Sequence, residues 1–186
     1  MGRKIFLSIA AVFLIWQSYD LLQMLPRLKD VSWGLAIFLA WIINLFITGI
    51  FAFSVFAFPT QKLLPGAYYK VRYPKQLKRC YKALNVELFR KMLLATLWKS
   101  QEKQQKYFNG KKDGIANLEE QSMKSEFGHL LPFLIINLVS IYMLTIGLTK
   151  LSLLTLLINI IGNLYPVILQ RHHRMRIQII RSRLKA

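Results

Sequence analysis

Two hydrophobic stretches in the C-terminal third of the chain each carry a regular row of polar side chains. In the first stretch, Glu126 and His129 are three residues apart, and Asn137 continues the same side of a helix. In the second stretch the polar positions again fall close to one helix face, and Arg171 adjoins them; they are Asn159, Asn163, Gln170 and Arg174. Because polar groups at membrane depth are costly, these rows predict a functional site.

The residue types in these rows fit acyl transfer to an alcohol. A carboxylate beside a histidine holds the imidazole in the tautomer that accepts a proton from a hydroxyl group. Arginines beside such a pair bind phosphate or stabilise an oxyanion. We therefore predict Glu126 and His129 as a catalytic pair. The structural alternative is an interfacial ion pair, with Arg171 and Arg174 as membrane anchors and the asparagines as contacts between helices.

Other chemistries find little support in the sequence. A di-iron site needs a second Glu-x-x-His motif and two further glutamates, and the chain has only the motif at Glu126, so no metal is predicted. The single cysteine, Cys80, cannot form an internal disulfide. The chain also lacks a glycine-rich phosphate loop and the His-x-x-x-x-Asp box of common acyltransferases.

The elements that must position these residues are membrane helices. Of 186 residues, 54% are apolar and 18% charged, more apolar than a soluble chain of this length. Four stretches are long enough to cross about 30 Å of hydrocarbon. They comprise residues 5–25, 31–58, 130–149 and 151–169. The sequence thus predicts an all-α integral membrane protein with four transmembrane helices.

The basic residues predict the orientation of these helices. The formal net charge is +18, and 23 of the 26 lysines and arginines fall on one side of the predicted membrane. By the positive-inside rule, both termini and the long connection are cytoplasmic, in a multi-pass protein of the cytoplasmic membrane. The same rule explains the charge without a nucleic acid, so no nucleic-acid partner is predicted.

The pattern divides the chain into four segments. An N-terminal pair of transmembrane helices (1–59) precedes a basic cytoplasmic connection (60–129), a C-terminal transmembrane hairpin (130–170) and a basic tail (171–186). Within the connection, apolar residues recur every three or four positions over 86–98, which predicts an amphipathic helix. Such a helix lies on the inner leaflet or packs against partner helices. Turn signals at 109–110 and 113–114 precede a predicted helix over 118–127.

One family shares this arrangement of polar residues. Glu126-Phe-Gly-His129, then Asn163, then Gln170-Arg171-His-His-Arg174-Met-Arg176 resembles the glycosyl diaponeurosporenoate acyltransferases that complete staphyloxanthin, and Trp98-Lys99 resembles their upstream Trp-Lys pair. The resemblance covers roughly residues 98–176. It implies a membrane enzyme that esterifies a sugar hydroxyl of a carotenoid glycoside with a fatty acyl group.

The resemblance also implies roles and partners. Glu126 and His129 would be catalytic, and the substrate-binding residues would be Asn163, Gln170, Arg171, Arg174 and Arg176. The expected partners are membrane lipids, a lipophilic glycoside acceptor and an acyl donor such as acyl-CoA or acyl carrier protein, with no cofactor. The alternative is a non-catalytic membrane protein, an assembly partner or transporter subunit. The oligomeric state, the acceptor and the acyl chain stay open.

Overall fold

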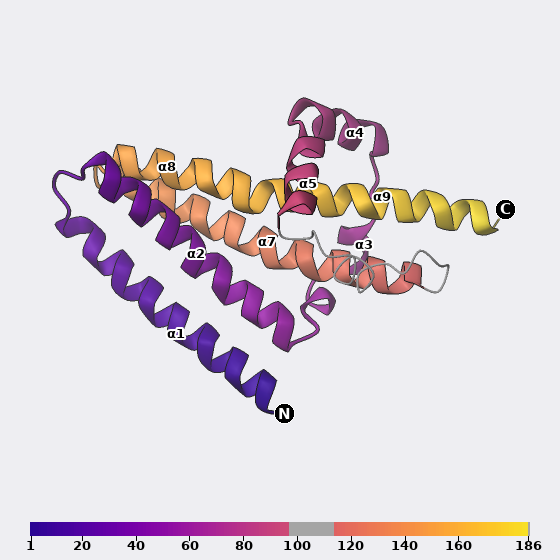
Figure 1. The fold of residues 1–186 in the computed structure, drawn as a ribbon, viewed down its shortest axis with the longest axis horizontal. Helices are drawn as coiled ribbons and strands as arrows, with labels where there is room; N and C mark the ends of the chain where they lie inside the picture. The colour runs from indigo at the N-terminus through magenta and orange to yellow at the C-terminus, as the bar shows by residue number, and fades with distance from the viewer. Residues whose placement is uncertain (97–113, 186) are drawn as a thin grey trace. The chain divides into compact units, whose positions relative to one another are not determined.

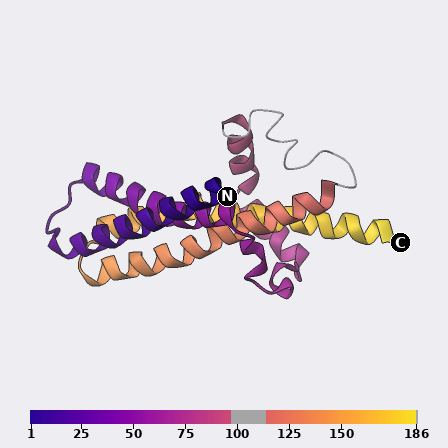
Figure 2. The ribbon, with the colours of Figure 1, turned by 90° about the horizontal axis from the view of Figure 1, so that it is seen from below.

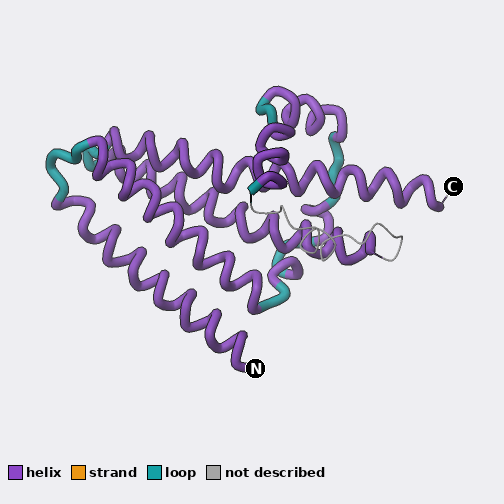
Figure 3. Tube along the Cα trace, in the orientation of Figure 1, coloured by secondary structure: helices purple, strands orange, loops and turns teal. Residues whose placement is uncertain are grey.

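The computed structural model of the protein describes residues 1–96 and 114–185. All regular structure within these ranges is helical (Figure 3). Four helical stretches are long and apolar enough to cross a membrane, namely Gly2–Arg27, Trp33–Ala57, Gly114–Thr145 and Thr149–Ser182. They confirm the predicted all-α membrane class.

The chain divides into two compact units, each built from segments distant in sequence. Unit 1 comprises Met1–Pro59 and Phe127–Leu164, and unit 2 comprises Thr60–Glu126 and Tyr165–Ala186. Two long helical stretches therefore contribute to both units. Each unit is described by itself.

Unit 1 consists of two antiparallel helix pairs (Figures 1 and 2). Its elements are α1 (Gly2–Met24), the 3-10 turn η1 (Leu25–Arg27), α2 (Trp33–Ala57), the later part of α7 (Gly114–Thr145), α8 (Thr149–Asn159) and the π-helical turn η3 (Ile160–Leu164). The Ser32 hydroxyl accepts a hydrogen bond from the Leu35 amide and begins α2, which ends before Pro59. Gly147, at φ +81°, makes the tight turn between α7 and α8.

The core of unit 1 is built around one face of α2, which packs against α1 and α8. Ala36, Ala40 and Ile43 on this face are almost fully buried. Small residues allow close approach: a Cβ on Gly49 would come within 2.6 Å of the Leu14 side chain of α1. The outer face of α1 remains apolar and exposed, as expected of a surface that faces lipid.

Unit 2 is built around α9 (Tyr165–Lys185), against which two short helices pack. Its other elements are η2 (Thr60–Lys62), α3 (Gly66–Tyr69), α4 (Pro74–Ala83), α5 (Val86–Ala95) and the first part of α7. Pro74 begins α4, where its missing amide hydrogen costs nothing. Asn85 adopts the left-handed conformation, φ 48°, which lets the chain turn sharply from α4 into α5.

The observed helices differ from the predicted ones in continuity. The predicted helix over 118–127 and the third span form one helix, α7, and α9 carries the fourth apolar stretch into the basic tail. The predicted amphipathic helix appears as α5, whose Phe89 ring lies 5.4 Å from the Tyr165 ring of α9. Phe89 thus contacts α9, whereas Met92 of the same apolar row is exposed, and the placement of this helix on the inner leaflet stays a prediction. Its last predicted residues, and both turn signals before Gly114, lie outside the described residues.

Candidate functional site

Unit 1 contains a buried hydrogen-bonded chain of neutral side chains that ends on His129, here called the asparagine–histidine chain. Asn159 Nδ2 donates to the Phe133 carbonyl at 3.0 Å, and Asn163 Nδ2 donates to Asn159 Oδ1 at 3.0 Å. Asn163 Oδ1 then lies 3.1 Å from His129 Nδ1. Thr48 of α2 joins from the side, accepting from Asn163 Nδ2 at 3.0 Å. Both asparagines are almost fully buried.

The direction of this chain determines the histidine tautomer. A backbone carbonyl only accepts, so Asn159 must turn its amide nitrogen to Phe133 and its oxygen to Asn163. Asn163 therefore presents nitrogen to Asn159 and oxygen to the imidazole. An oxygen acceptor requires a hydrogen on His129 Nδ1, which leaves Nε2 as the basic nitrogen of the neutral ring.

The π-helical turn η3 positions the partner of the imidazole. Asn163, whose side-chain oxygen contacts His129 Nδ1, lies within this turn. Pro166 has no amide hydrogen for the carbonyl four residues earlier, which is that of Gly162. Irregular turns of this kind free backbone groups for side chains and recur at functional sites.

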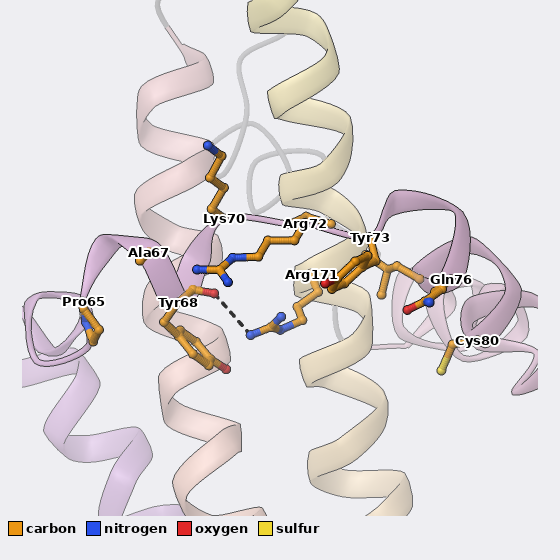
Figure 4. A pocket seen from close by; sticks show the side chains of 11 residues that line it. Pro65, Ala67, Tyr68, Lys70, Arg72, Tyr73, Gln76, Cys80 and Arg171 are labelled. Carbon is orange, nitrogen blue, oxygen red and sulfur yellow. Dashed lines mark hydrogen bonds between the residues drawn. The ribbon is translucent and has the colours of Figure 1, made fainter.

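Unit 2 contains an ionic arrangement, here called the carboxylate–arginine cluster. The Glu126 carboxylate is fully buried. Its Oε1 accepts from Arg171 Nε at 2.9 Å and from the Tyr68 hydroxyl at 2.6 Å, and its Oε2 accepts from Arg174 Nη2. Arg171 also donates to the Tyr68 carbonyl at 3.4 Å (Figure 4), and Arg174 Nε to the Tyr69 carbonyl at 3.2 Å.

The cluster carries one more positive than negative charge, and only part of this charge is buried. One carboxylate faces two guanidinium groups, and Arg174 is only 1% exposed. The tyrosine rings offset part of this excess, because Arg171 lies 4.6 Å from the Tyr68 ring centre and Arg174 lies 5.1 Å from that of Tyr69. Burial raises the pKa of the Tyr69 phenol, although Arg174 opposes this effect. Within the described residues, Arg174 Nη1 and the Tyr69 hydroxyl have no hydrogen-bond partner.

The comparison with protein families decides where this chain belongs. Residues 65–183 match the glycosyl-4,4'-diaponeurosporenoate acyltransferase family. The chain belongs to this family. This membership supports an acyltransferase activity in the modification of carotenoid glycosides. The family implies a lipophilic glycoside as acceptor and an acyl donor as the second substrate. The matched range contains all seven predicted site residues. No curated protein and no solved structure matches the chain.

In this family member, the two predicted catalytic residues have partners that their spacing did not indicate. Asn163, which the sequence predicted to bind substrate, is the residue that orients the His129 imidazole. Glu126, which was predicted to support that imidazole, is bonded to Arg171 and Arg174 instead of standing as an unpaired carboxylate. Their catalytic and binding roles stay predictions.

The other predicted binding residues differ in exposure. Gln170 is buried, and its backbone carbonyl accepts from Ser122 at 3.1 Å. Arg174 is enclosed in the cluster, whereas Arg171 is partly exposed and Arg176 is exposed. Only the last two therefore present a cation at the surface. Trp98 and Lys99, the upstream pair in the resemblance, lie outside the described residues.

Sequence reasoning did not single out several residues that complete the two arrangements. Thr48 is one hydroxyl within a long apolar stretch, and nothing in its surroundings marks it. Tyr68 and Tyr69 lie in a segment that mixes aromatic and basic residues, a pattern that suits a membrane interface. A buried carboxylate requires hydrogen-bond donors, and the tyrosine hydroxyls of this segment were candidates to supply one to Glu126.

Proposed function

We propose that this chain transfers a fatty acyl group from a thioester donor to a hydroxyl of a glycosylated carotenoid or related glycolipid, in the membrane. The observation that carries the proposal is the asparagine–histidine chain, which places the ring proton on His129 Nδ1 and makes Nε2 the basic nitrogen of the neutral ring. This observation stands in a chain that belongs to an acyltransferase family.

The proposed reaction uses His129 as general base and then general acid. Nε2 takes the proton of the acceptor hydroxyl while the hydroxyl oxygen attacks the acyl carbonyl carbon and forms the ester bond. The carbon–sulfur bond of the donor breaks, and the carrier leaves as a thiol after taking the proton back from the imidazolium. Asn163 accepts from Nδ1–H throughout, so the ring keeps its orientation as its charge changes.

The carboxylate–arginine cluster fits a positioning role better than a direct chemical one. Each carboxylate oxygen of Glu126 already accepts from a cationic or hydroxyl donor of the protein. The cluster joins α7, which carries Glu126, to α3, which carries Tyr68, and to α9, which carries both arginines. We propose that the cluster fixes these three elements of unit 2 and holds Arg171 where it can meet the donor.

Ester formation in membranes that carry single variants tests the proposal. His129→Ala should lower the rate by about 10²- to 10⁴-fold at matched protein level, because positioned acid–base catalysis contributes that much. Asn44→Leu is the matched control, since Asn44 is also a buried amide of unit 1 but bonds the carbonyls of Ala40 and Thr155, outside the asparagine–histidine chain. His173→Ala is a second control. Full activity in His129→Ala would refute the catalytic assignment.

A comparison of lipid extracts separates the enzyme from the non-catalytic alternative. Cells with the gene should contain a pigment or glycolipid heavier by one acyl chain than cells without it. An assembly partner or transporter subunit predicts no such product. Loss of protein in every variant above would likewise favour the structural alternative.

The proposed site also requires a particular orientation in the cytoplasmic membrane, with both termini inside. The exposed Cys80 is first replaced by serine. A cysteine introduced after Arg181, or at position 111 outside the described residues, should then resist an impermeant thiol reagent added to intact cells. A cysteine at Lys29 should react. Labelling at position 111 would overturn the orientation.

A further inference from the structure

An open pocket in unit 2 combines positive charge with apolar walls. It has a volume of about 630 Å³ and lies between the segment that follows Pro65, one face of α4, and Arg171 of α9 (Figure 4). Lys70, Arg72 and Arg171 supply three cations to its lining. Apolar groups, including Val71 and Leu77, supply much of the remainder.

The charge in this pocket is not neutralised by the protein. Arg171 shares the single carboxylate of Glu126 with Arg174. Lys70 and Arg72 make no ion pair with any residue in the described part of the chain. The three other glutamates of unit 2 in that part are paired elsewhere, with Arg90, Lys124 and Arg181. An anion entering the pocket therefore meets two cations, Lys70 and Arg72, that have no carboxylate partner in the described part of the chain.

The amino-terminal end of α4 adds a second source of positive potential. Tyr73, its N-cap residue, makes no side-chain hydrogen bond to the helix, and Tyr73 and Gln76 of this first turn line the pocket. The first-turn amides are thus not capped by a side chain, and a helix of ten residues presents a partial positive charge there. Amides at a helix amino terminus combined with arginines are a common phosphate-binding arrangement.

We propose that this pocket binds the phosphate ester group of an acyl-bearing molecule, with Lys70 and Arg72 as its principal ligands. The apolar walls would hold the carbon chain next to the phosphate. This inference deepens the proposed function and rests on it, since it identifies the anionic part of a substrate. Two molecules share the chemistry: a phosphopantetheine thioester such as acyl-CoA, and a phospholipid headgroup.

Calorimetric titration of the purified full-length protein in zwitterionic lipid tests the pocket without any acyl transfer. The probes are coenzyme A and a soluble short-chain phosphatidylglycerol, titrated separately at low salt. Lys70→Gln combined with Arg72→Gln should weaken binding of at least one probe by about 10- to 100-fold, as expected for lost charge-assisted hydrogen bonds. Loss for coenzyme A identifies a thioester donor, and loss for phosphatidylglycerol identifies a lipid headgroup.

Two further variants keep the test independent of total charge and of folding. Lys62→Gln combined with Lys91→Gln removes the same charge from exposed positions of unit 2 that do not line the pocket, and binding should be retained. Ala67→Trp fills the pocket without changing charge and should abolish binding. Equal loss in both double variants, full binding by Ala67→Trp, or no binding of either probe by the unaltered protein would overturn the pocket.

The outcome is separable from that of the proposed function. His129→Ala should bind the probes normally while losing ester formation. Ester formation with no probe binding would overturn the pocket and leave the reaction standing. Probe binding that depends on Lys70 and Arg72, with no ester formed, would support the pocket and overturn the reaction.

Discussion

Asn163 in unit 1 and Glu126 in unit 2 are both almost fully buried, but their partners differ in kind. Asn163 is held by neutral groups, each of which both donates and accepts, so the hydrogen-bonded chain has a direction that begins at a backbone carbonyl. Glu126 only accepts, and both its cationic partners only donate. A neutral chain can therefore specify the tautomer of a histidine, whereas an ionic cluster specifies position and charge.

This difference in hydrogen-bond partners also determines how each unit should respond to a substitution. Removing one amide from a neutral chain costs an ordinary hydrogen bond. Removing the carboxylate from a buried ionic cluster leaves uncompensated guanidinium groups in a medium of low dielectric constant. The expected division is between stability, carried by the cluster, and reactivity, carried by the asparagine–histidine chain.

The largest expected effect is on stability. Glu126→Gln should lower the free energy of unfolding by about 3–5 kcal/mol, because Arg171 and Arg174 lose their shared counter-ion. Thermal unfolding and limited proteolysis of unit 2 measure the change. Glu120→Gln is the control, since its carboxylate is about half exposed and is held by Lys124 and by the Gln61 amide, and should cost less than about 1 kcal/mol. Equal effects of the two variants would remove the distinction between the units.

Interrupting the asparagine–histidine chain should have a smaller effect, on the rate of ester formation. Asn163→Leu should lower the rate of ester formation by about 10²-fold, less than His129→Ala, because the base remains but its tautomer and orientation are no longer fixed. Asn159→Leu, one step further from the ring, should cost less. Ester formation at saturating substrate measures both. If Asn163→Leu forms ester as fast as Asn44→Leu, the asparagine–histidine chain has no catalytic role.

Unit 1 also has a polar contact that does not belong to the asparagine–histidine chain, and this contact tests the comparison between the two units. Asn44 Nδ2 of α2 donates to the Thr155 carbonyl of α8 at 3.1 Å. Asn44→Leu should destabilise the protein by only about 0.6 kcal/mol, the average for hydrogen bonds between membrane helices, and should leave ester formation unchanged. Reversible unfolding in mixed micelles measures the first effect. A loss of several kcal/mol would show that neutral contacts hold unit 1 as strongly as ions hold unit 2.

The smallest effect concerns pH and lies in unit 2 away from the cluster. The Arg90 and Tyr81 hydrogen bonds lower the pKa of Glu87 to about 2, and burial together with Glu87 raises the pKa of Tyr81 to about 12. The contact should thus be complete between the unperturbed values of 4.5 and 10.0. It should be lost as pH falls through about 2 or rises through about 12.

The absorbance of tyrosinate tests this pH range. The difference between the natural protein and Tyr81→Phe should show one phenol that ionises near pH 12. Glu87→Gln should move that transition toward pH 10 without reaching it, because burial, the largest cause, remains. A phenol that already ionises near pH 10 in the natural protein would contradict the Tyr81–Glu87 contact at 2.8 Å.

Hydropathy and periodicity predicted the helices well because membrane spans are specified by local composition. The four spans, and the helical positions of Glu126, His129 and Asn163, needed no tertiary information. The partners of these side chains did need it. A spacing of three residues indicates that Glu126 and His129 share a helix face. It does not indicate which side chains from other elements reach each of them.

The residues around the pocket illustrate the same limit. Lys70 and Arg72 belong to a short segment in which aromatic and basic residues alternate, and this pattern suits a membrane interface as well as an anion site. Only the placement of the segment beside the first turn of α4 distinguishes the two. The sequence shows that the basic residues are present, but it does not show that they line a pocket.

The contact between Thr48 and Asn163 changes what should count as the functional module of this protein. Similarity to the family begins at residue 65, after α2 has ended. Yet Thr48 of α2 accepts a hydrogen bond from the amide that orients His129. A fragment that starts at residue 65 would contain every predicted site residue and still lack one hydrogen-bond partner of Asn163. The unit that sequence comparison recognises is therefore smaller than the unit on which selection for activity would act.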